Sequence, residues 1–425
     1  MVTQYDRNLI RKARLSPPVA FIVSAIAFVF TVSSAQIQPK QPVTEPSDSA
    51  EIRVQIAHIQ KLLPNLPDRA AALYILAVLT QKLGQTHEAL KFLEQCAALH
   101  EGFDPAGSPT LRTLKGSSEF DQLVAMVHQE FPVVTASRLA FVANEKDLVP
   151  EGLAYDAKQD VFYLSSLNRR KIVRITPGGI ASNFSSSSHD NLLPILGIRT
   201  DSTDGSVWAA SWSEASEKSE LLHFNPSGQL LNRFSPGDSL QHGFNDLVVR
   251  KNGDVLLTDS LSNQVLLFKR GTATFTPLPV HRELSGPNGI ALAGDDRQLF
   301  VADDYGVIHL NLERGISTEL NRGPNSTLSG IDGLYWHNGS LIAIQNSIGS
   351  PRVVAFKLSK DTTSVEQTTV LENRTNFTIE PTTGAIRGDV FYFIANSQGP
   401  NVNEDRIVDP GKLEPVRIAR VHLPS

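Results

Sequence analysis

Three features of the sequence predict a mainly β fold, a six-bladed β-propeller, with a small α-helical domain in front of it. From residue 133 onward, short apolar or alternating runs are separated by Gly, Asn, Asp and Pro, which is typical of strands and turns. A similar unit recurs six times, with starts 45, 49, 43, 44 and 51 residues apart. Residues 51–131 instead carry apolar side chains every three or four residues, which is the period of a helix.

The N-terminus has the composition of a secretory signal peptide. Residues 1–16 are basic, residues 18–32 form an apolar run, and the small residues 33–35 follow it. A short apolar core with a small-residue ending is typical of a segment removed during export. We expect cleavage after Ala35 and a secreted or periplasmic protein. An uncleaved anchor is the alternative, and the chain would then contact the membrane only through this segment.

The overall composition excludes several classes of protein. The chain has 41% hydrophobic residues and a net charge of −5, from 39 Lys+Arg and 44 Asp+Glu. This hydrophobic content argues against a disordered chain, and the lack of a basic block argues against a nucleic-acid partner. The single cysteine, Cys96, excludes an intramolecular disulfide and a cysteine-rich metal cluster.

Between the signal peptide and the repeats, the sequence predicts a linker and a helical domain. Residues 36–50 are rich in Pro and polar residues and predict a flexible linker. Residues 51–132 form the expected helical domain, and residues 133–425 form the propeller. Gly84 is expected to end the second of four helices, Ser117 to cap the fourth, and Pro132 to close the domain.

The helix pair within residues 70–100 resembles a tetratricopeptide unit. The resemblance rests on an alternation of large and small residues, namely Leu76, Ala77, Gly84, Ala89, Leu93 and Cys96. It implies that this segment could bind a protein partner. Only one such unit is present, so a small helical cap or adaptor is the other interpretation. We expect Cys96 to be a buried packing residue rather than a reactive thiol.

Each repeat is long enough for four strands, and six such units fit a six-bladed propeller. The last unit reaches the end of the chain after its third strand. An unassigned strand, 138–143, precedes the first unit. We expect this strand to complete the last blade and close the ring, which would remove two exposed sheet edges.

The residue that opens each repeat is the most informative feature for function. It starts the innermost strand of its blade, so the six equivalent residues are expected to converge at one mouth of the central channel. They are Glu151, Leu196, Asn245, Asn288, Asp332 and Thr383. Four of them are carboxylates or carboxamides, and such oxygen donors favour Ca²⁺ over Mg²⁺ or Mn²⁺, with an open catalytic Zn²⁺ site as a further option. The alternative is that they only form turns, because Asn, Asp and Gly suit turn conformations.

Familiar catalytic motifs are absent from the sequence. There is no His-Glu-x-x-His, no Gly-x-Ser-x-Gly and no phosphate-binding Gly-rich loop. A serine hydrolase and a zinc protease are therefore disfavoured.

Residues 133–425 resemble the propellers of the senescence-marker-protein (regucalcin), gluconolactonase and luciferin-regenerating-enzyme family. That family holds one divalent cation with Glu, Asn, Asn and Asp from successive blades. The matching motifs here are Val-Pro-Glu151-Gly, Phe-Asn245-Asp, Pro-Asn288-Gly-Ile and Ile-Asp332-Gly-Leu. Sugar-lactone members often have an Arg two residues before the first Asn. This chain has Gly243 there, which argues against a sugar-acid lactone as substrate.

The resemblance implies a divalent-metal-dependent hydrolase, a lactonase or esterase, acting on a small-molecule lactone or ester. Glu151, Asn245, Asn288 and Asp332 would bind the cation, and Asp332 would also accept a proton from the attacking water. Asp246 would be either a further partner of the site or a residue of a turn or of the strand ladder. The alternative function is a non-catalytic protein-binding propeller or cell-envelope scaffold with a structural ion.

Overall fold

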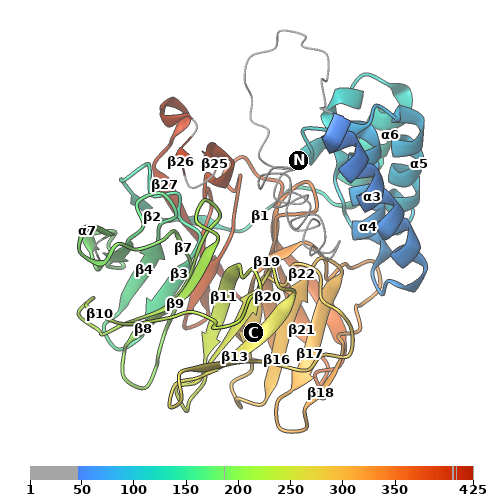
Figure 1. The fold of residues 1–425 in the computed structure, drawn as a ribbon. Helices are drawn as coiled ribbons and strands as arrows, with labels where there is room; N and C mark the ends of the chain where they lie inside the picture. Colours follow the sequence, from blue (N-terminus) through green and yellow to red (C-terminus); the bar gives the residue numbers. More distant parts are fainter. Residues whose placement is uncertain (1–45, 186, 404–405, 408, 425) are drawn as a thin grey trace, which may run out of the picture.

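The computed structural model describes residues 46–424 except for 186, 404–405 and 408. The expected signal peptide and most of the expected linker lie outside the described residues. The chain forms six radially arranged antiparallel sheets, the blades of a propeller, with the helices packed against one side (Figure 1). The mainly β, six-bladed prediction is confirmed.

Five of the blades are built from consecutive strands. The first two contain β3 (Leu153–Asp156), β4 (Val161–Ser165), β5 (Ile172–Ile175) and β6 (Ala181–Asn183), then β7 (Ile195–Thr200), β8 (Val207–Ser213), β9 (Lys218–Phe224) and β10 (Leu230–Phe234). The third and fourth contain β11 (Phe244–Val249), β12 (Val255–Asp259), β13 (Gln264–Lys269) and β14 (Thr274–Pro277), then β15 (Ile290–Leu292), β16 (Gln298–Asp303), β17 (Gly306–Asn311) and β18 (Ile316–Glu319). The fifth contains β19 (Ile331–His337), β20 (Ser340–Gln345), β21 (Arg352–Leu358) and β22 (Val365–Asn373), with the short β1 (Val134–Thr135) at its outer edge.

The sixth blade combines strands from both ends of the propeller. It contains β23 (Gly384–Arg387), β24 (Val390–Ile394) and β27 (Val416–His422), and β2 (Arg138–Ala143) pairs with the outer edge of β27. The innermost strands β23 and β3 are also in contact, so the ring is closed. The prediction that strand 138–143 completes the last blade is confirmed. Between β24 and β27 the chain forms a hairpin of β25 (Val402–Asn403) and β26 (Arg406–Ile407), and a short helix α7 (Ser187–Asp190) precedes β7.

The second strand of each blade explains the apolar runs in the repeats. All residues of β4 and of β12 are buried, whereas all residues of the outermost strand β6 are exposed. A strand that packs against neighbouring blades on both faces needs apolar side chains at every position rather than at alternate ones. The repeats therefore show continuous apolar runs at these strands.

Two of these second strands end in an aspartate, and both aspartates hold a loop. Asp259 accepts a hydrogen bond from the backbone N–H of Gly243 at 2.8 Å and contacts His242. Asp303 accepts from the N–H of Ser285 at 3.1 Å and pairs with a neighbouring arginine. The loops held in this way lead into β11, which contains Asn245, and into β15, which begins just after Asn288. Asp259 and Asp303 thus hold the backbone of the two loops that lead to the channel.

The helical domain contains four α-helices, as expected, and they differ from the prediction in two details. They are α3 (Pro46–Leu62), α4 (Arg69–Lys82), α5 (Thr86–Ala97) and α6 (Ser118–Glu130), with short 3₁₀ turns at Leu63–Asn65, Pro105–Gly107 and Leu111–Leu114. Helix α3 begins inside the stretch expected as linker, since Pro46 suits the first turn of a helix. Ser117 occupies the N-cap position of α6, but its hydroxyl makes no capping hydrogen bond. None of the helices in this described part of the chain is long and apolar enough to cross a membrane.

Cys96 is buried, as predicted, and only 3% of its surface is exposed. Its thiol donates to the carbonyl of Ala70, which lies on the neighbouring helix α4, at 3.4 Å. Burial raises the pKa of the thiol well above its usual value, so the reactive thiolate is disfavoured. The tetratricopeptide character of the domain and its protein partner stay predictions.

The helical domain docks on blades four and five. The N–H of Asp104 donates to the carbonyl of Ile348 at 2.8 Å, and the Thr327 hydroxyl bonds the buried Asp68 carboxylate. Ile348 belongs to the same apolar cluster as helices α4 and α5. The contacts of Ile348 hold the loop between β20 and β21 against the helical domain, and this loop begins with Asn346 beside the channel mouth.

We expect Gly349→Ala to loosen this docking. Gly349 has a φ of +90°, and a Cβ atom there would lie 2.0 Å from the carbonyl oxygen of Asp104. The substitution should cost about 2 kcal/mol or more of unfolding free energy, measured by urea denaturation. Gly388→Ala is the matched control, because Gly388 also has a positive φ but nothing within 4 Å, and it should cost only about 1 kcal/mol. Equal losses in the two variants would contradict the docking argument.

Candidate metal centre at the channel mouth

The inner strands approach one another closely where the channel opens. A Cβ atom on Gly152 would lie 2.2 Å from the Leu196 carbonyl oxygen, and one on Gly289 would lie 2.3 Å from that of Asp332. The glycine after each of these opening residues thus allows the next blade's backbone to approach. The same contact in the fifth blade is with the carbonyl of Thr382, at 2.8 Å. The opening residue of the sixth blade is therefore Thr382, one position before the predicted Thr383.

Asp332 lies at this mouth with only 7% of its surface exposed. Its Oδ2 accepts a hydrogen bond from the Asn346 amide at 2.6 Å, while its buried Oδ1 has no partner. Burial raises the pKa of Asp332 from its usual 3.8 to about 7, and the charge of Asp246 adds to the shift. The Asn346 amide, through its hydrogen bond, acts in the opposite direction and lowers the pKa, and the nearby Asn288 side chain lowers it further. With a pKa of about 7, the Asp332 carboxyl group is partly protonated at neutral pH.

Glu151 faces the same space from the first blade. Its backbone carbonyl accepts from the Thr383 hydroxyl at 2.5 Å, and its carboxylate accepts from the Ser397 hydroxyl at 3.4 Å. Burial raises the pKa of Glu151 well above its usual value, and the charge of Asp332 is the second cause. The two carboxylates are therefore close enough to repel each other.

The two amides lie between these acids in the ring order. Asn288 has a buried Oδ1 with no hydrogen-bond partner, and its backbone carbonyl accepts from the Thr258 hydroxyl at 2.7 Å. The Asn245 side-chain amide donates to the Ser260 hydroxyl at 3.1 Å. This bond fixes the nitrogen side of the Asn245 amide, so its oxygen faces the other way.

Asp246 has a definite partner, and it is not a turn residue. Only 1% of its surface is exposed, and its Oδ2 accepts from the Arg199 guanidinium at 2.7 Å. Sequence reasoning missed Arg199, Asn346 and Ser397. A signal for Arg199 was present, since the third residue after the opening residue is Ala154, Val248, Ala291, Tyr335 or Ala385 in the other blades.

The donor set at the mouth fits a hard divalent cation. Two buried oxygens, Oδ1 of Asn288 and Oδ1 of Asp332, lack hydrogen-bond partners, which is costly unless something binds them. Oxygen donors of this kind are what Ca²⁺ and related ions bind. No cluster of three or more His, Cys, Asp or Glu side chains suited to a metal occurs in the part of the chain that the structure describes. An ion at this mouth would therefore have to use the amide oxygens together with the two acids.

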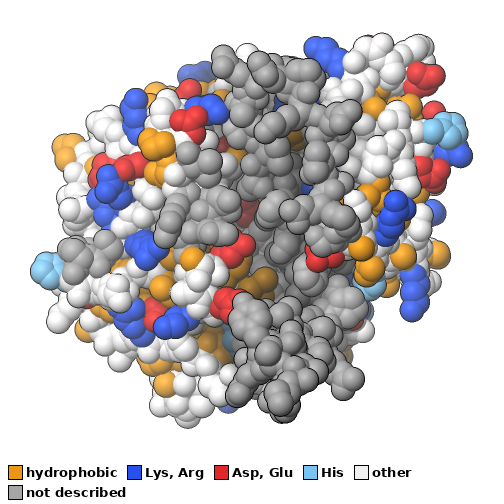
Figure 2. Space-filling model, turned by 45° about the horizontal axis from the view of Figure 1, so that its top comes forward, with side chains coloured by type: hydrophobic (Ala, Val, Ile, Leu, Met, Phe, Trp, Pro, Cys, Tyr) orange, Lys and Arg blue, Asp and Glu red, His pale blue; other side chains and the backbone are white. Residues whose placement is uncertain are grey.

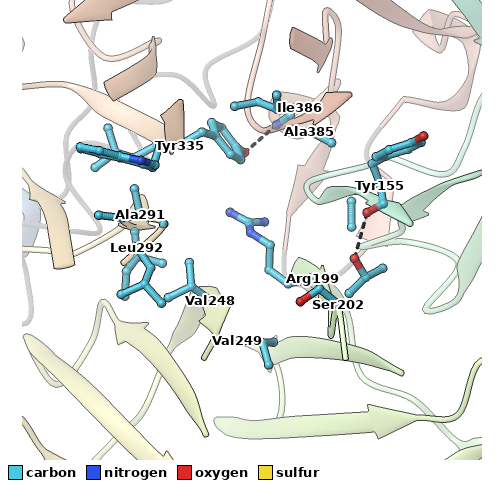
Figure 3. A pocket seen from close by; sticks show the side chains of 18 of the residues that line it. Tyr155, Arg199, Ser202, Val248, Val249, Ala291, Leu292, Tyr335, Ala385 and Ile386 are labelled. Carbon is cyan, nitrogen blue, oxygen red and sulfur yellow. Dashed lines mark hydrogen bonds between the residues drawn. The ribbon is translucent and has the colours of Figure 1, made fainter. Parts of the chain in front are cut away.

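A cavity of about 350 Å³ opens at the other end of the channel. It is lined by the later residues of all six inner strands, including Tyr155, Val249, Leu292 and Ile386 (Figure 3). The Arg199 side chain projects into the middle of this view, toward Tyr335. On the face that carries the helical domain, charged side chains of both signs are interspersed over the visible parts (Figure 2).

The raised pKa of Asp332 gives a testable pH dependence. Because the folded, metal-free chain holds this proton up to about pH 7, ionisation destabilises it as the pH rises from 3.8 to about 7. A cation must displace the proton to bind, so its stabilising effect should grow as the pH rises through 7. The increase in melting temperature given by saturating Ca²⁺ should be larger at about pH 8.5 than at about pH 5.5. An equal increase at both pH values would contradict the assignment.

Comparisons with known proteins find only distant likenesses. No family model and no curated protein matches the chain. Similar solved structures include a gluconolactonase of Xanthomonas campestris, 14% identical, with a TM-score of 0.49 over 69% of this chain and 91% of that one. Others are virginiamycin B lyase of Staphylococcus aureus (15% identity, TM-score 0.47, 68% and 100% covered) and PQQ-bound aldose sugar dehydrogenase of Streptomyces coelicolor (13%, 0.46, 68% and 99%). Likeness of this degree does not bear on activity, which has to be argued from the site.

Proposed function

We propose that the chain is an exported, divalent-metal-dependent hydrolase that acts on a lactone or small ester. The observation that carries this proposal is the pair of buried, unpartnered oxygens of Asn288 and Asp332 beside Glu151. The resemblance described above adds the reaction type. Glu151, Asn245, Asn288 and Asp332 would hold the cation, with Ca²⁺ as the first candidate.

When bound, the cation would supply Lewis-acid polarisation of the substrate carbonyl. The chain's own groups perform the remaining tasks. Asp332 would accept a proton from the attacking water through the part of its carboxylate that the cation leaves free, because a carboxylate beside the substrate can act as a general base. Asn346 holds Oδ2 of this carboxylate at 2.6 Å and so fixes its orientation. Ser397 and Thr383 hold Glu151 through its side chain and its backbone.

The loop beside Asn245 favours a substrate less polar than a sugar lactone. A Cβ atom on Gly243 would lie 2.7 Å from Cγ of Leu261, so an aliphatic side chain occupies the space in front of residue 243. No cation at this position is available to bind sugar hydroxyls or a carboxylate. We therefore expect aliphatic or aromatic lactones and esters to be better substrates than sugar-acid lactones.

The test uses the mature 36–425 chain, stripped with a chelator and then supplied with Ca²⁺, Zn²⁺, Mn²⁺ or Mg²⁺. Thermal stability is followed together with the hydrolysis of a panel of lactones and esters. Metal-dependent turnover is the expected result. Stabilisation by metal without turnover on any substrate would favour a binding or scaffold propeller with a structural ion. No response to any metal would mean that the four residues only form turns.

Export is tested separately, from the N-terminus of the protein recovered outside the cytoplasm. We propose cleavage after Ala35, so the first residue of the recovered chain should be Gln36. Recovery of the chain with Met1 intact in the membrane fraction would instead show an uncleaved anchor.

A further inference from the structure

A guanidinium group crosses the channel beneath the candidate metal centre. Arg199 lies on β7 in the second blade, and its guanidinium carbon is 5.1 Å from the centre of the Tyr335 ring on β19 in the fifth blade, on the opposite side (Figure 3). The Tyr335 hydroxyl in turn accepts from the N–H of Gly384 at 2.6 Å. On its way across, Arg199 donates to Asp246 at 2.7 Å. Arg199 thus reaches across the channel, between the mouth at one end and the cavity at the other, while it pairs with Asp246.

Neither Arg199 nor Asp246, the two members of this ion pair, belongs to the repeating pattern of the propeller. The residue after the opening residue is glycine in four blades, Gly152, Gly197, Gly289 and Gly333, but Asp246 in the third. Two residues further on, Arg199 is the single charged residue among the six equivalent positions. Two charges of opposite sign have therefore been introduced together at positions where the fold itself needs none.

The charges of the mouth depend on this pair. Asp246 directly follows the candidate ligand Asn245, and its backbone N–H donates at 3.0 Å to the Thr258 hydroxyl, which donates to the carbonyl of Asn288 at 2.7 Å. Asp246 is thus joined to two of the candidate ligands, and its carboxylate adds to those of Glu151 and Asp332. When ionised they carry −3, and the guanidinium of Arg199 adds +1, so the sum is −3 + 1 = −2. The charge of Glu380, on the loop before β23, also repels the Glu151 carboxylate, but less strongly than the charges of Asp332 and Asp246 do.

We propose that Arg199 is a positioning residue that cancels the charge of Asp246 and so sets the mouth to accept one divalent cation. The inference rests on the proposed metal site. The number of ligand charges is a main determinant of cation affinity in oxygen-donor sites. Without Arg199 the same groups would carry −3 and favour a trivalent ion, and without the Asp246 charge they would carry −1 and bind a divalent ion weakly.

The test is a charge-compensation cycle in the chelator-stripped full chain, with Ca²⁺ and Tb³⁺ binding measured by calorimetry. Asp246→Asn should weaken Ca²⁺ binding by about tenfold or more, and Arg199→Met should shift the preference from Ca²⁺ toward Tb³⁺ by about tenfold. The double variant restores the sum of −2, so its Ca²⁺ affinity should return to within about threefold of the unmodified chain. Arg250→Met is the matched control, because it breaks the 3.2 Å ion pair with Asp296 far from the mouth, and it should change neither affinity.

A purely structural ion pair gives a different result. Each single variant would then be less stable, but the ion preference would not move, and the double variant would not recover. That outcome overturns the inference while the unmodified chain still binds Ca²⁺. If the unmodified chain binds neither ion, the proposed metal site itself is wrong and the inference falls with it. Thermal denaturation checks folding, and Arg199→Gln, which can still donate to Asp246 without a charge, replaces Arg199→Met if that variant does not fold.

Discussion

Asp332→Asn should leave the propeller folded and lower the turnover of lactones or esters by about 10²–10⁴-fold, the usual contribution of a general base. An amide has the shape of the carboxylate but cannot accept the proton from water. Stability should not fall, because burial already disfavours the ionised form of Asp332, whose pKa is raised to about 7. Turnover is measured at saturating metal, and unfolding of the metal-free chain is measured in parallel.

The matched control for this variant is Asp389→Asn. Asp389 lies in the turn between β23 and β24, and its side chain is 79% exposed. This variant should hydrolyse substrates at the rate of the unmodified chain. If Asp332→Asn also keeps that rate, Asp332 is not the base.

Phe141→Ala should destabilise the chain by about 3–5 kcal/mol, which is the usual cost of deleting a buried aromatic side chain. Phe141 lies on β2, the strand that closes the ring, and its ring centroid is 5.4 Å from that of Phe162 in the first blade. It therefore joins the sixth blade to the first. Leu139→Ala on the same strand is the control, because Leu139 is 47% exposed, and it should cost about 0.5 kcal/mol or less. Similar losses in urea denaturation would show that β2 does not hold the ring closed.

The repeat pattern was sufficient to predict the architecture. Six units, four strands in each, and a strand before the first unit to complete the last were all deduced from apolar runs and turn residues. The single misplaced opening residue has a local cause. In the first, second, fourth and fifth blades a glycine follows the opening residue, whereas Thr383 stands between Thr382 and Gly384 in the sixth. Matching the glycines therefore shifted this blade by one residue.

The residues around the metal centre were harder to predict than the candidate ligands themselves. Asn346 reaches Asp332 from the next loop of the same blade, and Ser397 reaches Glu151 from the neighbouring blade, 246 residues along the chain. Arg199 and Asp246 meet only because their blades are adjacent. Such contacts depend on the closed ring and the exact direction of each side chain. Local sequence spacing does not contain this information.

The central claim, that the channel mouth is a cation site, is tested most directly by calorimetric titration of the chelator-stripped chain with Ca²⁺. We predict one ion per chain, and Asn288→Ala, which removes one unpartnered oxygen, should weaken binding by about tenfold or more. Asn252→Ala, in an exposed turn of the third blade, should bind as the unmodified chain does. No binding by the unmodified chain, or equal binding by the Asn288→Ala variant, would contradict the metal site.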